Sequence, residues 1–396
     1  MPPLLIVALL SLLLGLQPLT TDLYLPALPA LTAGLGASIA QAQLTLTALL
    51  LAFGSSQLVW GPLSDRFGRR PILLWGMGAY VLAAVGCAAA PDMEWLIVAR
   101  AVQGAALGAA VMCARAIVRD LYAPTEGMRI MSKGQSGLGV LACISAPLGG
   151  LLADWMGWRA ALLALGVFGA VAFTLVLLRF EETVPRHGRQ PLRPGPLLRT
   201  WRTILVHPTF WAFSLLTAAS YGGLFTFLAT SSFVFIQELG LTRTQYGLVM
   251  FTMPMTYILG TIACRRLLPR LGPRRTVALA GGLSLLGGAL MGALAWAGLR
   301  SSWAIMLPFY IFMLAHGVHQ PSGQSGAIGP FPQAAGAASA LNGFLMMVVA
   351  FAMGSWLSTH AQLSASLLAA GVCFWGVLTA LAAWTLVQKH GHAREH

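Results

Sequence analysis

The chain has 396 residues, of which 57% are hydrophobic and 9% charged, and its mean hydropathy is +0.76. This balance excludes an ordinary soluble domain and predicts a multi-pass membrane protein, because a spanning helix needs about 20 apolar residues. The net charge of +13 would suggest nucleic acid binding in a soluble chain. Here the basic residues lie between apolar runs, so we expect them to orient the protein in the bilayer, with no nucleic acid partner.

Twelve apolar runs of spanning length follow one another along the chain, and we expect the first to be retained as a span rather than cleaved as a signal peptide. The runs cover about 4–25, 43–61, 72–90, 95–117, 130–152, 159–179, 208–230, 245–263, 276–298, 303–322, 336–357 and 363–387. A long polar segment separates the sixth run from the seventh. The predicted fold is all-α, with an N-terminal six-helix bundle (1–180), a cytoplasmic central loop (181–207) and a pseudo-symmetric C-terminal six-helix bundle (208–396).

The distribution of basic residues predicts the orientation of these spans. An even number of spans places both termini on one side of the membrane. By this topology, 20 of the 24 lysines and arginines fall in loops on the side of the termini. Arg159, Arg243 and Arg300 fall on the other side, and Arg100 lies within a span. The positive-inside rule therefore predicts cytoplasmic termini, and the alanine- and arginine-rich composition suggests a bacterial inner membrane.

The first span carries Asp22, and the fourth carries Arg100. At 1.5 Å per residue, Asp22 lies roughly 27 Å along its span, and Arg100 lies about 8 Å in from the outer face. Both depths fall in the outer half of the membrane, so the two side chains can meet. In one interpretation Asp22 merely ends the span and Arg100 extends to the interface. In the other, Asp22 exchanges protons beside a fixed cation, since ionisable groups within spans are usually functional.

The segment between the second and third runs, Gly61-Pro-Leu-Ser-Asp65-Arg66-Phe-Gly68-Arg69-Arg70-Pro71, concentrates charge in a chain that has little. We expect Gly61 and Gly68 to allow a tight turn and close helix contact. We expect a charge network that closes a cytoplasmic gate, with a simple orienting role as the alternative. Its predicted members are Asp65, Arg66, Arg69, Arg70 and Asp120, with Glu181 as a further candidate.

A weak internal repeat relates the two halves. Gly61, Asp65 and Arg66 recur at the same offsets as Gly260, Cys264 and Arg265, so a cysteine stands where the first copy has an acid. The two gates are therefore expected to differ chemically.

The tenth run carries His316 and His319, which an i, i+3 spacing places on neighbouring positions of one helix face. We interpret them as polar lining of an internal cavity, with proton movement as an alternative. The five cysteines show no paired spacing, so we predict neither a disulfide nor a metal site.

Several motifs carry a family resemblance. The segment from Gly61 to Arg70 resembles the loop 2–3 signature of the major facilitator superfamily. Asp22-Leu-Tyr-Leu-Pro-Ala-Leu-Pro29 and Arg100-Ala-Val-Gln103-Gly104 resemble signatures of the bicyclomycin/chloramphenicol-resistance (Bcr/CflA) family of drug:proton antiporters. Arg119-Asp120-Leu-Tyr122 and Glu181-Glu-Thr-Val-Pro185 resemble the same family. Ala146-Pro147-Leu148-Gly149-Gly150 departs from the antiporter signature of span 5, which expects Gly-Pro-x-x-Gly-Gly.

This resemblance implies export of small drug-like compounds, driven by inward proton flow without a cofactor. It implies that Asp22 and Arg100 form the proton-coupling pair and that spans 1, 4, 7 and 10 line the substrate cavity. The cavity candidates are Tyr24, Gln103, Tyr221, Phe225, Phe227, Phe309, Tyr310, His316 and His319.

A dedicated metabolite or siderophore exporter on the same scaffold is the main alternative, and an integral-membrane transferase is a lesser one. The transferase would need clustered acids, whereas Asp65, Asp120 and Asp154 are scattered in loops. An amphipathic drug or antibiotic, protons and membrane lipid are the expected partners, and we expect a monomer, because one chain already holds two pseudo-symmetric halves.

Overall fold

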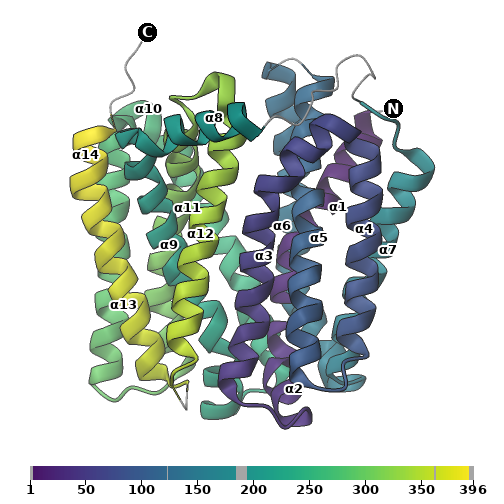
Figure 1. The fold of residues 1–396 in the computed structure, drawn as a ribbon. Coiled ribbons are helices and arrows are strands. Elements are labelled where there is room, and N and C mark those ends of the chain that lie inside the picture. Colours follow the sequence, from purple (N-terminus) through teal and green to yellow (C-terminus); the bar gives the residue numbers. More distant parts are fainter. Residues whose placement is uncertain (1–2, 123, 184–193, 361–362, 392–396) are drawn as a thin grey trace. The chain divides into compact units, whose positions relative to one another are not determined.

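The structure is a computed structural model that describes residues 3–122, 124–183, 194–360 and 363–391, and every regular element in these ranges is a helix (Figure 1). The helices form two compact units. Unit 1 comprises residues 1–193 and 242–251, and unit 2 comprises residues 194–241 and 252–396. The boundary near residue 193 falls within the predicted central loop.

The described residues of unit 1 form six long helices and two short ones. The long helices are α1 (Pro3–Asp22), α3 (Ile39–Phe67), α4 (Arg69–Ala88), α5 (Met93–Leu121), α6 (Pro124–Trp155) and α7 (Trp158–Arg179). The short helices η1 (Leu25–Ala27) and α2 (Leu28–Gly34) follow α1. Helix α3 begins at a capping box, in which the Ser38 hydroxyl accepts from Gln41 N and the Gln41 side chain accepts from Ser38 N.

Unit 2 begins with α8 (Pro194–Val206), which lies in the segment that the sequence analysis assigned to a polar loop. The remaining helices are α9 (Pro208–Ser232), η3 (Phe233–Glu238), α10 (Arg243–Trp296), α11 (Ser302–Ile328), η4 (Pro332–Ala334), α12 (Ala335–Leu357), α13 (Ala365–Leu381), η5 (Ala382–Leu386) and α14 (Val387–His390). Residues 243–251 at the start of α10 pack with unit 1.

Eleven helices of the described chain are long and apolar enough to cross a membrane. One of them, α10, has 54 residues. At 1.5 Å per residue it would extend about 80 Å, whereas a hydrocarbon core is about 30 Å thick. Gly272 interrupts α10 with non-helical angles (φ 75°, ψ 167°), so the element makes two crossings. The twelve predicted spans are thus confirmed as an all-helical membrane bundle.

A glycine with positive φ makes a sharp bend between two long helical segments in each unit. Gly68, between α3 and α4, has φ 100° and ψ 163°, close to the angles of Gly272. Both angles lie in a region that side chains with a Cβ rarely adopt. Glycine is therefore required at the same kind of sharp bend in each unit.

Apolar side chains cover much of the surface. Leu4, Leu82 and Trp75 are among the large apolar residues that face outward, at 82%, 74% and 56% exposure. On a soluble protein such a surface would cause aggregation, whereas in a bilayer it faces lipid. The buried side chains include polar and charged ones in both units, and the candidate sites are built from these residues.

Candidate functional site

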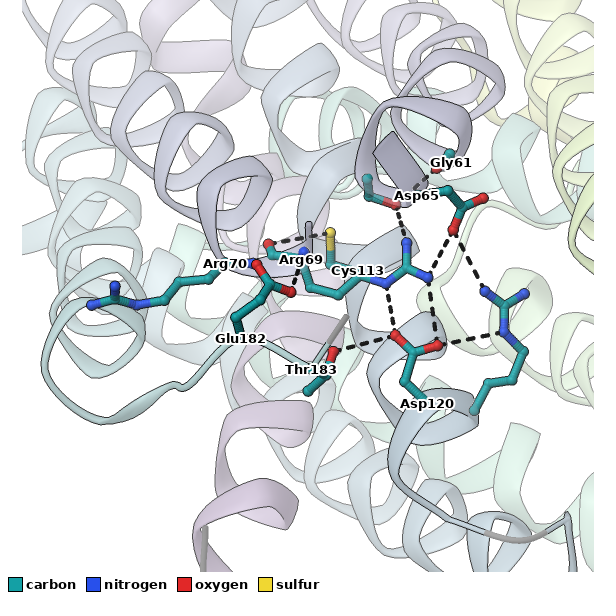
Figure 2. Close-up of polar contacts among 10 residues, drawn as sticks. Gly61, Asp65, Arg69, Arg70, Cys113, Asp120, Glu182 and Thr183 are labelled. Carbon is teal, nitrogen blue, oxygen red and sulfur yellow. Dashed lines mark hydrogen bonds and ion pairs between the residues drawn. The ribbon is translucent and has the colours of Figure 1, made fainter. Parts of the chain in front are cut away.

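Arg69 is the centre of an ion-pair cluster at one end of unit 1 (Figure 2). It is the first residue of α4, and its side chain is only 3% exposed. Its guanidinium lies 2.7 Å from Asp65 Oδ1, at the end of α3, and 2.8 Å from Asp120 Oδ2, at the end of α5. It also donates to Ser64 Oγ at 2.5 Å. One buried cation thus joins the ends of three helices, a task suited to the planar guanidinium with its several donors.

A carboxylate from the segment that follows α7, distant in the sequence, completes this cluster. Glu182, just after α7, accepts from the backbone amides of Arg69 at 2.8 Å and Arg70 at 3.2 Å. These amides belong to the first turn of α4, where donors lack helical partners and negative charge is favoured. Thr183 donates its hydroxyl to Asp120 Oδ2 at 3.2 Å. Glu182, and not the predicted Glu181, therefore closes the network.

The predicted gate residues Arg66 and Arg70, and Arg119, which was not predicted as a gate residue, have different surroundings. Arg119 is 62% exposed and lies 3.7 Å from Asp65, on the rim of the cluster. Arg70 points away from Arg69 in Figure 2 and donates to Leu177 O at 2.9 Å, while Arg66 lies over the Phe67 ring. These contacts place Arg66 and Arg70 outside the ion-pair network.

Gly61 and Gly68, the two glycines of this sequence motif, are not equivalent. A Cβ at Gly68 would stand 2.7 Å from Glu182 Cδ, and closer still to its Oε2. At Gly61 a Cβ would meet only Met112 Cε, at an ordinary 3.5 Å. The expectation that Gly61 is needed for close helix contact is therefore wrong, because space for a methyl group exists there.

Arg100 occupies a second polar site, in the interior of unit 1. It lies on α5 and is fully buried. Its Nη1 donates to Gln103 Oε1 at 2.8 Å and its Nη2 to Thr20 O at 3.0 Å. Its guanidinium carbon lies 4.3 Å from the centroid of the Tyr24 ring, a cation–π contact. Among the described residues Nε has no hydrogen-bond partner.

The side chains around Arg100 form a continuous buried network. Tyr24 hydrogen-bonds the Thr45 hydroxyl of α3, and Tyr80 of α4 lies 2.7 Å from the Thr20 hydroxyl. Sequence reasoning identified Arg100, Gln103 and Tyr24 but missed the threonines and Tyr80. Polar residues inside an apolar span were the available signal, since a buried polar group needs a partner.

Asp22 is the last residue of α1 and is half-buried. Its Oδ1 accepts from the Thr21 hydroxyl at 2.8 Å. In the part of the chain that is described, no ion pair joins Asp22 to Arg100. The two are instead connected through the last turn of α1, because Arg100 binds the carbonyl of Thr20, two residues before Asp22. The direct contact that their predicted depths allowed is absent from this structure.

The aromatic cavity candidates of unit 2 lie on α9 and α11, and two of them stack on each other. Phe227 of α9 stacks on Phe309 of α11 with ring centroids 3.8 Å apart, and both are fully buried, as is Phe225. Tyr221 is 8% exposed, and the Tyr310 hydroxyl lies 2.7 Å from Thr252 Oγ1 on α10. Tyr221, Phe225, Phe227 and Phe309 are thus buried inside unit 2, whereas Tyr310 is partly exposed.

His316 and His319 are both buried on α11, but they contact different helices. His316 Nδ1 lies 2.8 Å from Ser220 Oγ on α9, whereas His319 Nε2 lies 3.2 Å from Ser284 Oγ on α10. The i, i+3 spacing therefore does not make them a hydrogen-bonded pair. Each holds α11 to a neighbouring helix, which accounts for a polar residue in an apolar core.

The fold defines a multi-pass helical membrane protein, and its family match identifies a transporter rather than an enzyme. The sequence profile described as Major Facilitator Superfamily matches residues 10–355, and the chain belongs to that family. Among curated proteins, it is 29% identical to a chloramphenicol resistance protein of Pseudomonas aeruginosa over 82% of this chain and 77% of that protein. It is also 29% identical to multidrug resistance protein D of Escherichia coli, over 97% of this chain and 96% of that one. These relatives confirm the resemblance to the bicyclomycin/chloramphenicol-resistance proteins.

Solved structures agree on the fold. The human organic anion transporter MFSD10 superposes with a TM-score of 0.72 at 21% identity, covering 98% of this chain and 100% of that one. A D-xylose–proton symporter superposes with a TM-score of 0.75 at 16% identity, covering 97% of each chain. At such identities the likeness supports the helical architecture alone, and membership of a transporter family sets aside the transferase considered from the sequence.

Proposed function

We propose that this protein is a proton-driven exporter of small drug-like compounds in a bacterial inner membrane, working by alternating access as a monomer. The drug-resistance proteins to which the chain is similar support the substrate class. We further propose that the ends of the units rich in arginine, which include the Arg69 cluster, face the cytoplasm, as the positive-inside rule predicts.

The observation that carries proton coupling is the arrangement at the last turn of α1. The guanidinium of Arg100 is the fixed cation of this site, and it is buried against the carbonyl of Thr20. Asp22 lies two residues further on the same turn and is the group that can change charge. When Asp22 is ionised, this turn and Arg100 together are neutral, and when it is protonated they carry one positive charge. Proton uptake thereby alters the electrostatics of the site, which is the requirement for coupling to substrate binding.

The Arg69 cluster supports a proposed cytoplasmic latch. Its ion pairs connect three helix ends of unit 1, and hydrogen bonds to Glu182 add the segment after α7, so these contacts keep this end of the unit rigid. We propose that this end of unit 1 keeps its shape while the two halves move relative to each other during transport. The orienting role considered from the sequence does not need a buried arginine, because an exposed one serves it equally well.

Drug-triggered proton release tests the proposal. Purified protein in detergent near neutral pH is mixed with a panel of amphipathic antibiotics, and the released protons are measured in wild type, Asp22→Asn and Glu94→Gln. Glu94 is exposed at the start of α5 and is the control for loss of one acid. We expect release in the wild type and in the control and none in Asp22→Asn, which cannot titrate at this position.

The other outcomes discriminate between alternatives. Release that persists in Asp22→Asn would refute Asp22 as the coupling group and direct attention to His316 and His319. Silence of the wild type across the panel would instead favour the dedicated metabolite or siderophore exporter. Uptake of the same drugs into inverted vesicles, driven by an imposed proton gradient, would then be absent as well.

A further inference from the structure

The arginine-rich end of unit 2 carries an amphipathic helix outside the spans. Figure 1 shows α8 lying crosswise to the long helices of its unit, and its C-terminal end is held by Trp211 Nε1, which donates to Leu205 O at 2.6 Å. Ile204 faces the unit and is fully buried, whereas Leu198 and Val206 are 60% and 73% exposed. A helix with such an outward apolar face, next to the spans, is suited to the membrane interface.

Arginines are interleaved with these outward apolar residues. Arg199 and Arg202 of α8 are both exposed. At 100° per residue, Arg202 lies between Leu198 and Val206 around the helix, so its charge rises from an apolar surface. Long basic side chains next to buried apolar groups typically extend to lipid headgroups.

The same end of unit 2 is basic throughout. Its described lysines and arginines come from α8, the bend of α10 and α14: Arg199, Arg202, Arg265, Arg266, Arg270, Arg274, Arg275 and Lys389. Glu238 is the single acid among the described residues of unit 2, and it accepts from Ala365 N at 2.8 Å at the opposite end of the helices. None of these basic residues forms an ion pair within the described chain, so no described acid compensates their charge.

Unit 1 shows by contrast how such a bend is neutralised. There Asp65 pairs with Arg69 four residues on. In unit 2 the repeat places Cys264 where unit 1 has Asp65, and Cys264 lies in an apolar cluster with Val318, against which Leu268 packs. Glu182 fills the space beside Gly68, whereas a Cβ on Gly272 would meet nothing within 4 Å. Carboxylates of the protein thus neutralise the bend at Gly68, whereas no described carboxylate neutralises the bend at Gly272.

We propose that the exposed arginines of α8 and of the α10 bend bind the phosphate groups of anionic phospholipids, with the apolar face of α8 seated in the adjoining leaflet. Charge complementarity favours this occupant, because the cytoplasmic leaflet supplies anionic headgroups at the depth of these side chains. Neutral lipid would leave the basic surface uncompensated. The proposal rests on the proposed orientation but not on drug export, so its test involves no transport.

Native mass spectrometry of the full-length protein tests this site. Detergent-purified protein is titrated with phosphatidylglycerol or phosphatidylcholine, and bound lipids are counted. The variants are Arg199→Gln with Arg202→Gln, and Arg265→Gln with Arg266→Gln. Because an arginine near an anionic surface changes affinity about fivefold, we expect a pair to weaken phosphatidylglycerol binding about 25-fold. Phosphatidylcholine binding should be unchanged, and raised salt should weaken the wild-type preference.

The control removes the same charge elsewhere, with Arg159→Gln and Arg300→Gln in the opposite loops, and circular dichroism verifies that each variant is folded. If a test pair loses more phosphatidylglycerol affinity than the control pair does, the result supports a lipid site on the helix that carries that test pair, α8 or α10. Equal binding of both lipids by the wild type, or equal losses in the test and control pairs, would overturn the proposal. Displacement of bound phosphatidylglycerol by inorganic phosphate at constant ionic strength would also overturn it, since the site would then recognise free phosphate.

Discussion

Replacing Gly68 by alanine should disrupt the junction of α3 and α4. The residue has φ 100°, where a Cβ costs roughly 1–3 kcal/mol. The added Cβ would also stand 2.7 Å from Glu182 Cδ, so the carboxylate must leave the amides of Arg69 and Arg70. Losing two charge-assisted hydrogen bonds costs roughly 1.5–3 kcal/mol each, less what water restores at this partly open end.

The expected total is about 3–6 kcal/mol of folding free energy, which should appear as a lower unfolding temperature of the purified protein. Gly61→Ala provides the matched control in the same sequence motif. It lies within α3, and a Cβ there meets only Met112 Cε at 3.5 Å. We expect it to be neutral or to stabilise by up to about 1 kcal/mol, because alanine favours helix.

A double-mutant cycle with Glu182→Ala separates the two causes. If the carboxylate clash contributes, Gly68→Ala should cost clearly less in the Glu182→Ala background, since the hydrogen bonds are already lost. An unchanged cost would assign the whole effect to backbone strain. Gly68→Ala as stable as Gly61→Ala would refute both the bend geometry and the role of Glu182.

Three further changes test other contacts. Arg69→Lys should destabilise by about 1–3 kcal/mol, because an ammonium cannot satisfy both Asp65 and Asp120 as the guanidinium does, whereas exposed Arg66→Lys should change the unfolding temperature little. Asp65→Asn should slow transport with substrate affinity nearly preserved, and a normal transport rate in vesicles would eliminate the latch. Ser220→Ala should cost about 1–3 kcal/mol by leaving an imidazole nitrogen buried without its partner, and an unaltered thermal unfolding curve would contradict that hydrogen bond.

The sequence by itself determined the class of protein and the position of its spans. Run length predicted twelve crossings, including two in the segment that the structure shows as the single 54-residue helix α10. The charge concentrated between the second and third apolar runs was enough to predict a cluster that includes Asp65, Arg69 and Asp120. Local rules of helix geometry and hydropathy suffice for such features.

Tertiary structure decided which partners these residues contact. Glu182 rather than its neighbour Glu181 reaches the start of α4, more than 100 residues away in the chain. Arg100 binds a backbone carbonyl and Gln103 instead of pairing directly with Asp22, and α8 forms in a segment whose composition suggested a polar loop. Each outcome depends on how helices are rotated and packed against one another. The depth of a residue along its span does not determine which way its side chain faces. Asp22 and Arg100, which were predicted to meet because they lie at similar depths, therefore have different partners.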